Sequence, residues 1–210
     1  MLATPLKNLD HSSNDQSLDD STLWLSFKKG NDLAFSILYN KYVKRLYNYG
    51  MHACRDKELV LDCLQELFTR LWDKREKLGE VTCVNFYLFK SFRRLLMQRL
   101  TVGKKLLISI SNKDRQGFDF VPSSEDILIE EEWELERNKK LTNSLHSLTK
   151  RQREAIFLKF FNQLSYHDVA VIMDLHVDSV YNLISKSIDI LRKKLKASAI
   201  FMLTLIYLVS

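Results

Sequence analysis

Apolar residues recur at intervals of three and four through the first half of the chain, the spacing typical of amphipathic helices. The pattern predicts four helices: 23–27 with Gly30 closing it, one from Asp32 onward, one over about 56–77 and one over about 85–100. Each has one apolar stripe, so the four can bury a common core. We expect residues 21–100 to form a helical bundle, after a disordered lead over residues 1–20.

The second half begins with a change of composition. Residues 101–124 contain two glycines, a proline and several serines, and they predict an inter-domain linker. Helical spacing returns over 125–196, with capping-box signals at Thr149 and Ser165. The whole chain has only 5 Gly and 2 Pro, a scarcity that favours long helices over short strands. The expected fold class is therefore all-α, with two small helical domains.

The segment 164–195 predicts a short helix, a three-residue turn and a longer helix with a basic end. Short polar side chains near the start of a recognition helix can meet base edges in the major groove, and basic ones can reach phosphates. The outer positions of the longer helix are of these kinds: Ser179, Tyr181, Asn182, Ser185 and Lys186. A plain helical hairpin with a solvated outer face would give the same spacing.

The helix expected over 85–100 is basic, and no acidic residue interrupts residues 85–105. Its interleaved aromatic residues suit contact with single-stranded nucleic acid, although Phe89 and Phe92 also lie on the core stripe. The preceding helix instead carries an outer strip that includes Asp62, Gln65 and Glu66. This strip is either a protein-contact face or a simple solvated face.

Net charge and cysteine content narrow the classes of function. The formal net charge of +6 favours a polyanionic partner such as nucleic acid or an acidic membrane surface. The three cysteines, Cys54, Cys63 and Cys83, form no metal-ligand pattern; we expect core positions and a reducing cytoplasm. No paired carboxylates or activated nucleophile stand out, so we expect neither an enzyme nor a cofactor or metal site.

The order of four segments resembles the sigma-70 family of bacterial transcription initiation factors, in its small extracytoplasmic-function (ECF) group. Residues 32–42 are similar to the first helix of that family, and DCLQELFTRLW (62–72) is similar to its polymerase-clamp motif. NFYLFKSFRRLLMQRL (85–100) is similar to its promoter-melting helix. Residues 148–195 resemble its second DNA-binding domain nearly end to end.

The resemblance implies a region 2 bundle (21–100) and a region 4 helix-turn-helix (125–196), joined by a flexible linker (101–124). Such a factor would bind core RNA polymerase, direct it to promoters and favour strand opening, without catalysis of its own. The implied polymerase-binding residues are Asp62, Gln65, Glu66, Phe68 and Trp72. Those implied for the minus-ten element and its melted strand are Lys90, Arg93, Arg94, Gln98 and Arg99. Those implied for the minus-35 duplex are Arg151, Ser179, Tyr181, Asn182, Ser185 and Lys186.

Three positions depart from the pattern of the family. Arg94 stands where asparagine is common, His176 where serine or threonine often caps the recognition helix, and Asp174 where the turn often has glycine. These departures concern strand capture and the way in which the helices begin and bend.

The last residues form an apolar tail over 197–209. As a helix it would span about 20 Å, short of the roughly 30 Å of a bilayer core, so we expect no stable membrane insertion. Packing or contact with a partner, including an anti-sigma factor, is the expected role. Similar tails fit Bacteroidetes-type members of the group.

Two other classes of function fit the sequence. A pure protein-interaction module fits only if the basic helix over 85–100 never meets DNA. A helix-turn-helix regulator could bind an operator independently of polymerase, and it would usually need a dimer interface to space two half-sites.

Overall fold

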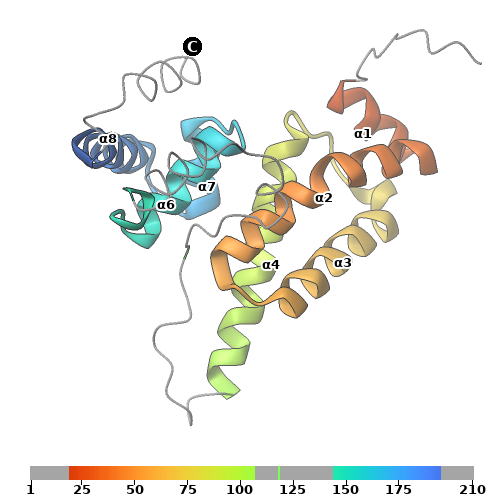
Figure 1. The fold of residues 1–210 in the computed structure, drawn as a ribbon. Coiled ribbons are helices and arrows are strands. Elements are labelled where there is room, and N and C mark those ends of the chain that lie inside the picture. The colour runs from red at the N-terminus through yellow and green to blue at the C-terminus, as the bar shows by residue number, and fades with distance from the viewer. Residues whose placement is uncertain (1–18, 107–117, 119–143, 195–210) are drawn as a thin grey trace, which may run out of the picture.

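The computed structural model describes residues 19–106, 118 and 144–194 (Figure 1). All regular structure in these ranges is helical, as expected for an all-α chain. The α-helices are α1 (Asp20–Lys28), α2 (Asp32–Cys54), α3 (Lys57–Asp73), α4 (Val84–Leu106), α6 (Lys150–Ile156), α7 (Tyr166–Met173) and α8 (Val177–Lys194). A 3-10 turn, η1 (Arg75–Lys77), follows α3, and a π-helical turn, η2 (Phe157–Phe161), follows α6.

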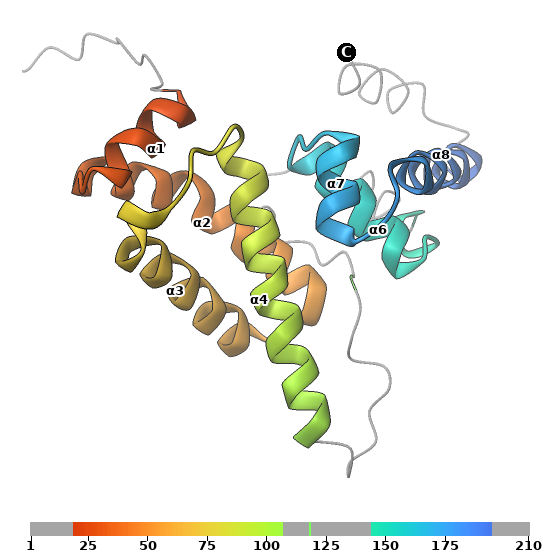
Figure 2. The ribbon, with the colours of Figure 1, turned by 180° about the vertical axis from the view of Figure 1, so that it is seen from behind.

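Helices α1 to α4 form the predicted N-terminal bundle. Helix α2 packs against α1, α3 and α4, and α3 also packs along α4 (Figure 2). The largest buried side chains of the bundle are aromatic and include Trp24, Phe27, Tyr42, Phe89 and Phe92. The ring centroids of Trp24 and Phe27 lie 5.3 Å apart in an edge-to-face arrangement that aromatic pairs favour.

Local signals in the sequence set where these helices begin and end. The side chains of Asn31 and Asp56 cap α2 and α3 by accepting hydrogen bonds from Ala34 N and Leu59 N, both at 3.0 Å. Gly30, the expected stop after the first helix, has φ +85°, a conformation open to glycine without strain. The chain can therefore turn sharply from α1 into α2.

The C-terminal half contains the predicted helix-turn-helix. Both capping boxes form, between Thr149 and Gln152 and between Ser165 and Asp168. Asp174 ends α7 in the left-handed conformation, with φ 56° and ψ 57°. Aspartate tolerates this region better than most residues, so it can take the place of the glycine common in the family.

Several boundaries differ from the sequence-based expectation. Helix α3 ends at Asp73, where the expected helix continued to 77, and the tighter turn η1 takes over. Helix α4 continues to Leu106, beyond the expected linker start at 101. The π-helical turn at Phe157–Phe161 was not predicted. The expected helix from 125 onward lies almost wholly outside the described residues, as do the lead and the apolar tail.

Gly50 on α2 allows a close approach of α3 and α4 and provides a test of this packing. A Cβ at Gly50 would lie 2.8 Å and 2.9 Å from the two γ-carbons of Val60, and 3.2 Å from Cζ of Phe92. Overpacking lowers the free energy of unfolding by about 1–3 kcal/mol. The higher helix propensity of alanine relative to glycine offsets up to about 1 kcal/mol of this loss. We expect Gly50→Ala to lower the free energy of unfolding in urea. Gly79→Ala is the control, because a Cβ there meets nothing within 4 Å; equal stability of the two variants would contradict this packing.

Candidate nucleic-acid interface

The outer face of α8 gathers the residues predicted to read duplex DNA. Ser179, Tyr181, Asn182, Ser185 and Lys186 are all exposed. The opposite face is buried and includes Val180, Ile184 and Leu191. The helix ends in three exposed basic residues, Arg192, Lys193 and Lys194. The arrangement therefore presents short polar groups near the start of the helix and cations near its end.

Tyr181 on this face is stacked on Tyr166, the first residue of α7. The two ring centroids are 4.0 Å apart with an interplanar angle of 16°, and Nζ of Lys159 lies 4.7 Å from the centroid of the Tyr166 ring. Partial burial, and then the neighbouring Tyr181, raise the pKa of Tyr166. Sequence analysis selected Tyr181 but missed Tyr166 and Lys159, because no periodic pattern links positions 159, 166 and 181.

Arg151, expected to contact phosphate, is exposed in the first turn of α6. Arg153, two residues later, is buried instead. Its side chain donates to the carbonyl oxygens of Phe118 (2.8 Å) and Leu148 (2.7 Å). The two arginines therefore differ in role, since Arg153 anchors the chain internally.

The basic residues of α4 do not share one surface. Lys90 is exposed, with Nζ 5.4 Å from the ring centroid of Phe86. Arg94 and Gln98 line a cavity beside α3. Arg99 donates to Glu66 of α3 at 2.6 Å, and Arg93 faces α6. A helix that packs on two sides separates residues that are neighbours in sequence, so the five expected minus-ten residues lie in four different settings.

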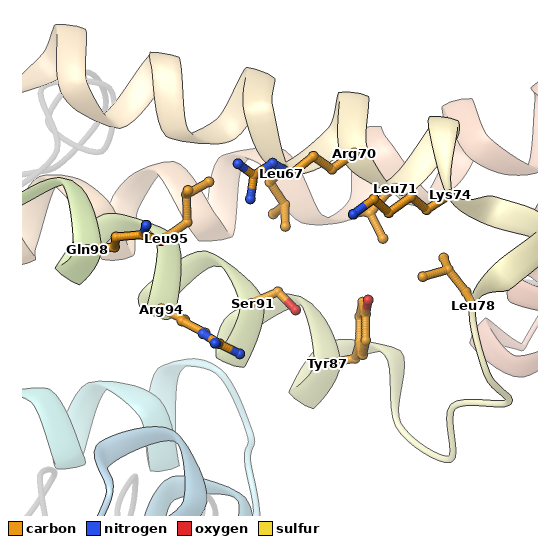
Figure 3. A pocket seen from close by; sticks show the side chains of 10 residues that line it. All are labelled: Leu67, Arg70, Leu71, Lys74, Leu78, Tyr87, Ser91, Arg94, Leu95 and Gln98. Atoms are coloured by element: carbon orange, nitrogen blue, oxygen red, sulfur yellow. The ribbon is translucent and has the colours of Figure 1, made fainter.

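The cavity between α3 and α4 has a volume of about 390 Å³ (Figure 3). Its apolar lining comes from leucines of both helices and Leu78 in the turn after α3, with the aromatic ring of Tyr87. Three cationic side chains, Arg70, Lys74 and Arg94, also line it. Apolar and aromatic walls with cationic groups suit an unpaired base and its phosphate. Tyr87 is one of the interleaved aromatic residues that the sequence indicated for single-strand contact. Sequence analysis missed Arg70 and Lys74, because the outer positions of α3 were considered only as a protein-contact or solvated face.

The strip on α3 is partly exposed and partly engaged. Asp62 and Gln65 are exposed. The carboxylate of Glu66 is paired with both Arg70 and Arg99. The strip therefore presents less free negative charge than its sequence indicates.

The two aromatic residues of the expected polymerase motif serve the core. Phe68 is buried, and its ring centroid lies 4.7 Å from that of Tyr39. Trp72 is half-buried, 5.1 Å from the ring of Phe35, and the Arg75 guanidinium lies 4.5 Å from its centroid. Both side chains hold α3 on the bundle, while Asp62 and Gln65 of the same motif remain exposed.

Glu154 of α6 joins the C-terminal half to the bundle. Its Oε1 accepts hydrogen bonds from the hydroxyl of Tyr49 at 2.7 Å and from Nε of Arg93 at 2.8 Å. Burial raises the pKa of Tyr49 well above its usual value, and the nearby Glu154 carboxylate adds to this. Burial opposes the charge of Arg93, but the Glu154 carboxylate outweighs it and raises the pKa of the guanidinium. The ion pair is therefore favoured in this arrangement.

Further contacts between the C-terminal half and the bundle lie around the Glu154–Arg93 pair. The carbonyl oxygen of Asn162, at the end of η2, accepts from Arg45 at 3.0 Å and from Asn85 at 2.8 Å. The buried ring of Phe118, from the linker, lies 5.7 Å from that of Tyr49 and 5.2 Å from that of Phe157. Helix α7 also packs against α4 (Figure 2). The same side of α2 and α4 is thus covered by the C-terminal half.

Other kinds of site are not found in the part of the chain that the structure describes. That part contains no cluster of side chains suited to a metal ion. It also contains no helix with the length and apolarity needed to cross a bilayer. Cys54 and Cys63 are buried, as expected for core positions, and burial raises the pKa of Cys63 to about 11. Cys83 is partly exposed.

Comparison with known proteins agrees with this geometry. Residues 138–189 match the family described as "Sigma-70, region 4". CnrH, solved in complex with the cytosolic domain of CnrY, is 18% identical with a TM-score of 0.53, covering 86% of this chain and 99% of that chain. The sigma factor RpoE from Bartonella quintana, solved with the anti-sigma factor NepR, is 16% identical with a TM-score of 0.58, covering 78% of this chain and 98% of that chain.

At these identities the structural matches establish a shared fold, and the sequence match shows similarity to region 4 of sigma-70 over residues 138–189. No curated protein matches the chain in sequence. The expected all-α fold is therefore confirmed.

The capping box at the start of α7 gives a direct test of the helix-turn-helix geometry. Ser165 Oγ accepts from Asp168 N at 3.0 Å, and Asp168 Oδ2 accepts from Ser165 N at 3.1 Å. We expect Ser165→Ala to lower the free energy of unfolding by about 1 kcal/mol, because the first turn loses its cap. His167→Ala, at an exposed position in the same turn, is the control. Chemical denaturation measures both, and a Ser165→Ala variant as stable as the wild type would refute the cap.

Proposed function

We propose that the chain is an RNA polymerase sigma factor of the ECF group, acting in the cytoplasm. The observation that carries this proposal is the region 4 match over residues 138–189, on a helix-turn-helix whose expected DNA-reading residues are all exposed. The shared fold with the sigma factor RpoE supports it over most of the chain. A Bacteroidetes-type origin rests on the sequence resemblance alone.

In the proposed function, α8 enters the major groove of the minus-35 element. Asn182 has the amide donor and acceptor needed for bidentate pairing with adenine. Ser179 and Ser185 can donate or accept, and Lys186 and Arg151 reach phosphates. The basic end of α8 adds sequence-independent affinity.

The cavity between α3 and α4 would hold part of the melted minus-ten strand. Arg94 and Gln98, expected for this element, line it together with Arg70, Lys74 and Tyr87. An unpaired base can stack on the tyrosine while the cations contact phosphate. Binding the opened strand better than the duplex shifts the equilibrium toward opening, and no bond-making chemistry is required.

The outward face of α3 would dock on core polymerase. Asp62 and Gln65 are exposed there, and the side chain of Leu61 beside them is 46% exposed. An apolar side chain among polar ones is a common composition for a protein contact. An anti-sigma factor is a further proposed partner, because RpoE was solved bound to one.

Binding to core polymerase separates this proposal from an operator-binding regulator. We expect the purified chain to co-migrate with bacterial core RNA polymerase in size-exclusion chromatography. The triple variant Asp62→Ala/Gln65→Ala/Glu66→Ala should lose co-migration, because it removes the polar groups of the α3 face.

The control for this experiment is Asn40→Ala/Glu76→Ala/Glu80→Ala, which likewise removes one amide and two carboxylates, from exposed positions elsewhere. This control should still co-migrate. A wild-type chain that does not bind core polymerase, and that forms a stable dimer alone, would instead indicate an operator-binding regulator.

The cavity makes a separate prediction about single-stranded DNA. We expect Lys74→Ala to weaken binding of a single-stranded minus-ten oligonucleotide and to reduce the slope of log K against log salt by about 0.7, the value for one phosphate contact on a single strand. Lys77→Ala is the control, because Lys77 is exposed but does not line the cavity. Fluorescence anisotropy at several salt concentrations measures both; equal slopes for the two variants would argue against phosphate contact in the cavity.

A further inference from the structure

The surface of the bundle around Arg93 is occupied in this structure by the C-terminal half of the same chain. Glu154 is paired with Arg93 and Tyr49, and Asn162 is bonded to Arg45 and Asn85. The side chains of Arg93 and Glu154 are only 21% and 11% exposed. A residue expected to grip the melted strand is thus held by an internal carboxylate.

We propose that Glu154 competes with the melted DNA strand for Arg93, so that packing of the two halves and strand binding at Arg93 exclude each other. This inference rests on the proposed function and on the expectation, from the sequence resemblance, that Arg93 contacts the minus-ten strand. The cavity beside α3 would hold another part of the same strand. Two alternative occupants therefore share one surface of the bundle: the end of α6 with η2, or an unpaired DNA strand. This surface is formed by Arg45, Tyr49, Asn85 and Arg93.

The contacts explain why the two occupants cannot be present together. If a phosphate pairs with Arg93, the Glu154 carboxylate keeps only the Tyr49 hydroxyl of its two donors. A buried carboxylate that has lost its cationic partner is costly. The cost is avoided only when Glu154 moves into water, which requires α6 to leave the bundle. Helix α7 rests on α4 and would leave with it.

The linker is part of the same arrangement. Phe118 is 4% exposed, and its ring lies close to those of Tyr49 and Phe157. Its carbonyl oxygen accepts a hydrogen bond at 2.8 Å from Nε of Arg153, the residue before Glu154. Separation of the halves removes the bundle from one side of this ring. A partner that holds the halves apart would therefore release both Arg93 and Phe118.

Glu154→Gln tests the competition, since it keeps an acceptor for Tyr49 and removes the charge that holds Arg93. We expect a larger radius of gyration by small-angle X-ray scattering. We also expect about tenfold tighter binding of a fluorescein-labelled single-stranded oligonucleotide, if open molecules are about a tenth of the wild-type population. Tyr49→Phe keeps the buried ring but removes the hydroxyl that bonds to Glu154. It should raise the radius of gyration and the affinity for the oligonucleotide as well, but less than Glu154→Gln does.

Two controls separate competition from other effects. Glu76→Gln changes the net charge equally at an exposed position and should leave both readouts at their wild-type values. Arg93→Ala should also open the molecule but should not gain affinity for the strand, because it removes the shared residue. Circular dichroism verifies that each variant is folded.

The outcomes distinguish failure of this inference from failure of the proposed function. The competition is refuted if Glu154→Gln and Tyr49→Phe both keep the wild-type radius of gyration and the wild-type affinity for the oligonucleotide. It is also refuted if Arg93→Ala gains as much affinity as Glu154→Gln. If polymerase co-migration holds but no variant binds the oligonucleotide, the inference fails and the proposed function stands. A wild-type chain that does not co-migrate with core RNA polymerase would refute the proposed function.

Discussion

The Glu154 carboxylate is the group on which the arrangement of the two halves depends. A carboxylate with 11% of its side chain exposed must have donors, and here they come from α2 and α4 of the bundle. Both donors reach one oxygen atom, so α6 can occupy only a narrow range of positions relative to α2 and α4. The contacts of Asn162, Phe118 and Phe157 on the same side follow from that position.

Helix α4 shows how one helix can take part in several interactions. Its apolar stripe is buried in the bundle, Arg94 and Gln98 border the cavity toward α3, and Arg93 points to α6. Adjacent residues on a helix lie about 100° apart around its axis, so Arg93 and Arg94 necessarily face different neighbours. Basic residues that are neighbours in sequence are therefore divided between the cavity beside α3 and an intramolecular contact.

Much of the fold could be predicted because its signals are local. Asn31, Asp56, Thr149 and Ser165 cap helices by bonds within three residues, and the apolar stripes repeat within each helix. The exposed face of α8 follows from the same periodicity. Such signals are legible in one sequence, because each depends only on residues a turn or two apart.

The parts that sequence analysis missed depend on distant or finely balanced contacts. Glu154 and Arg93 are 61 positions apart, and no pattern in either helix indicates that they meet. The cationic side of the cavity was missed for the same reason, because Arg70 and Lys74 matter only once α4 lies beside α3. The π-helical turn buries Phe157 and Leu158, and the α-helical repeat does not indicate such a turn.

In the proposed function, this chain directs core RNA polymerase to specific promoters. The most direct test is transcription in vitro from genomic DNA of the organism that encodes the chain, using core RNA polymerase with and without it, followed by mapping of transcript 5′ ends. The account predicts discrete start sites that appear only with the chain and share two upstream sequence elements at a fixed spacing. Start sites indistinguishable from those of core polymerase alone would contradict it.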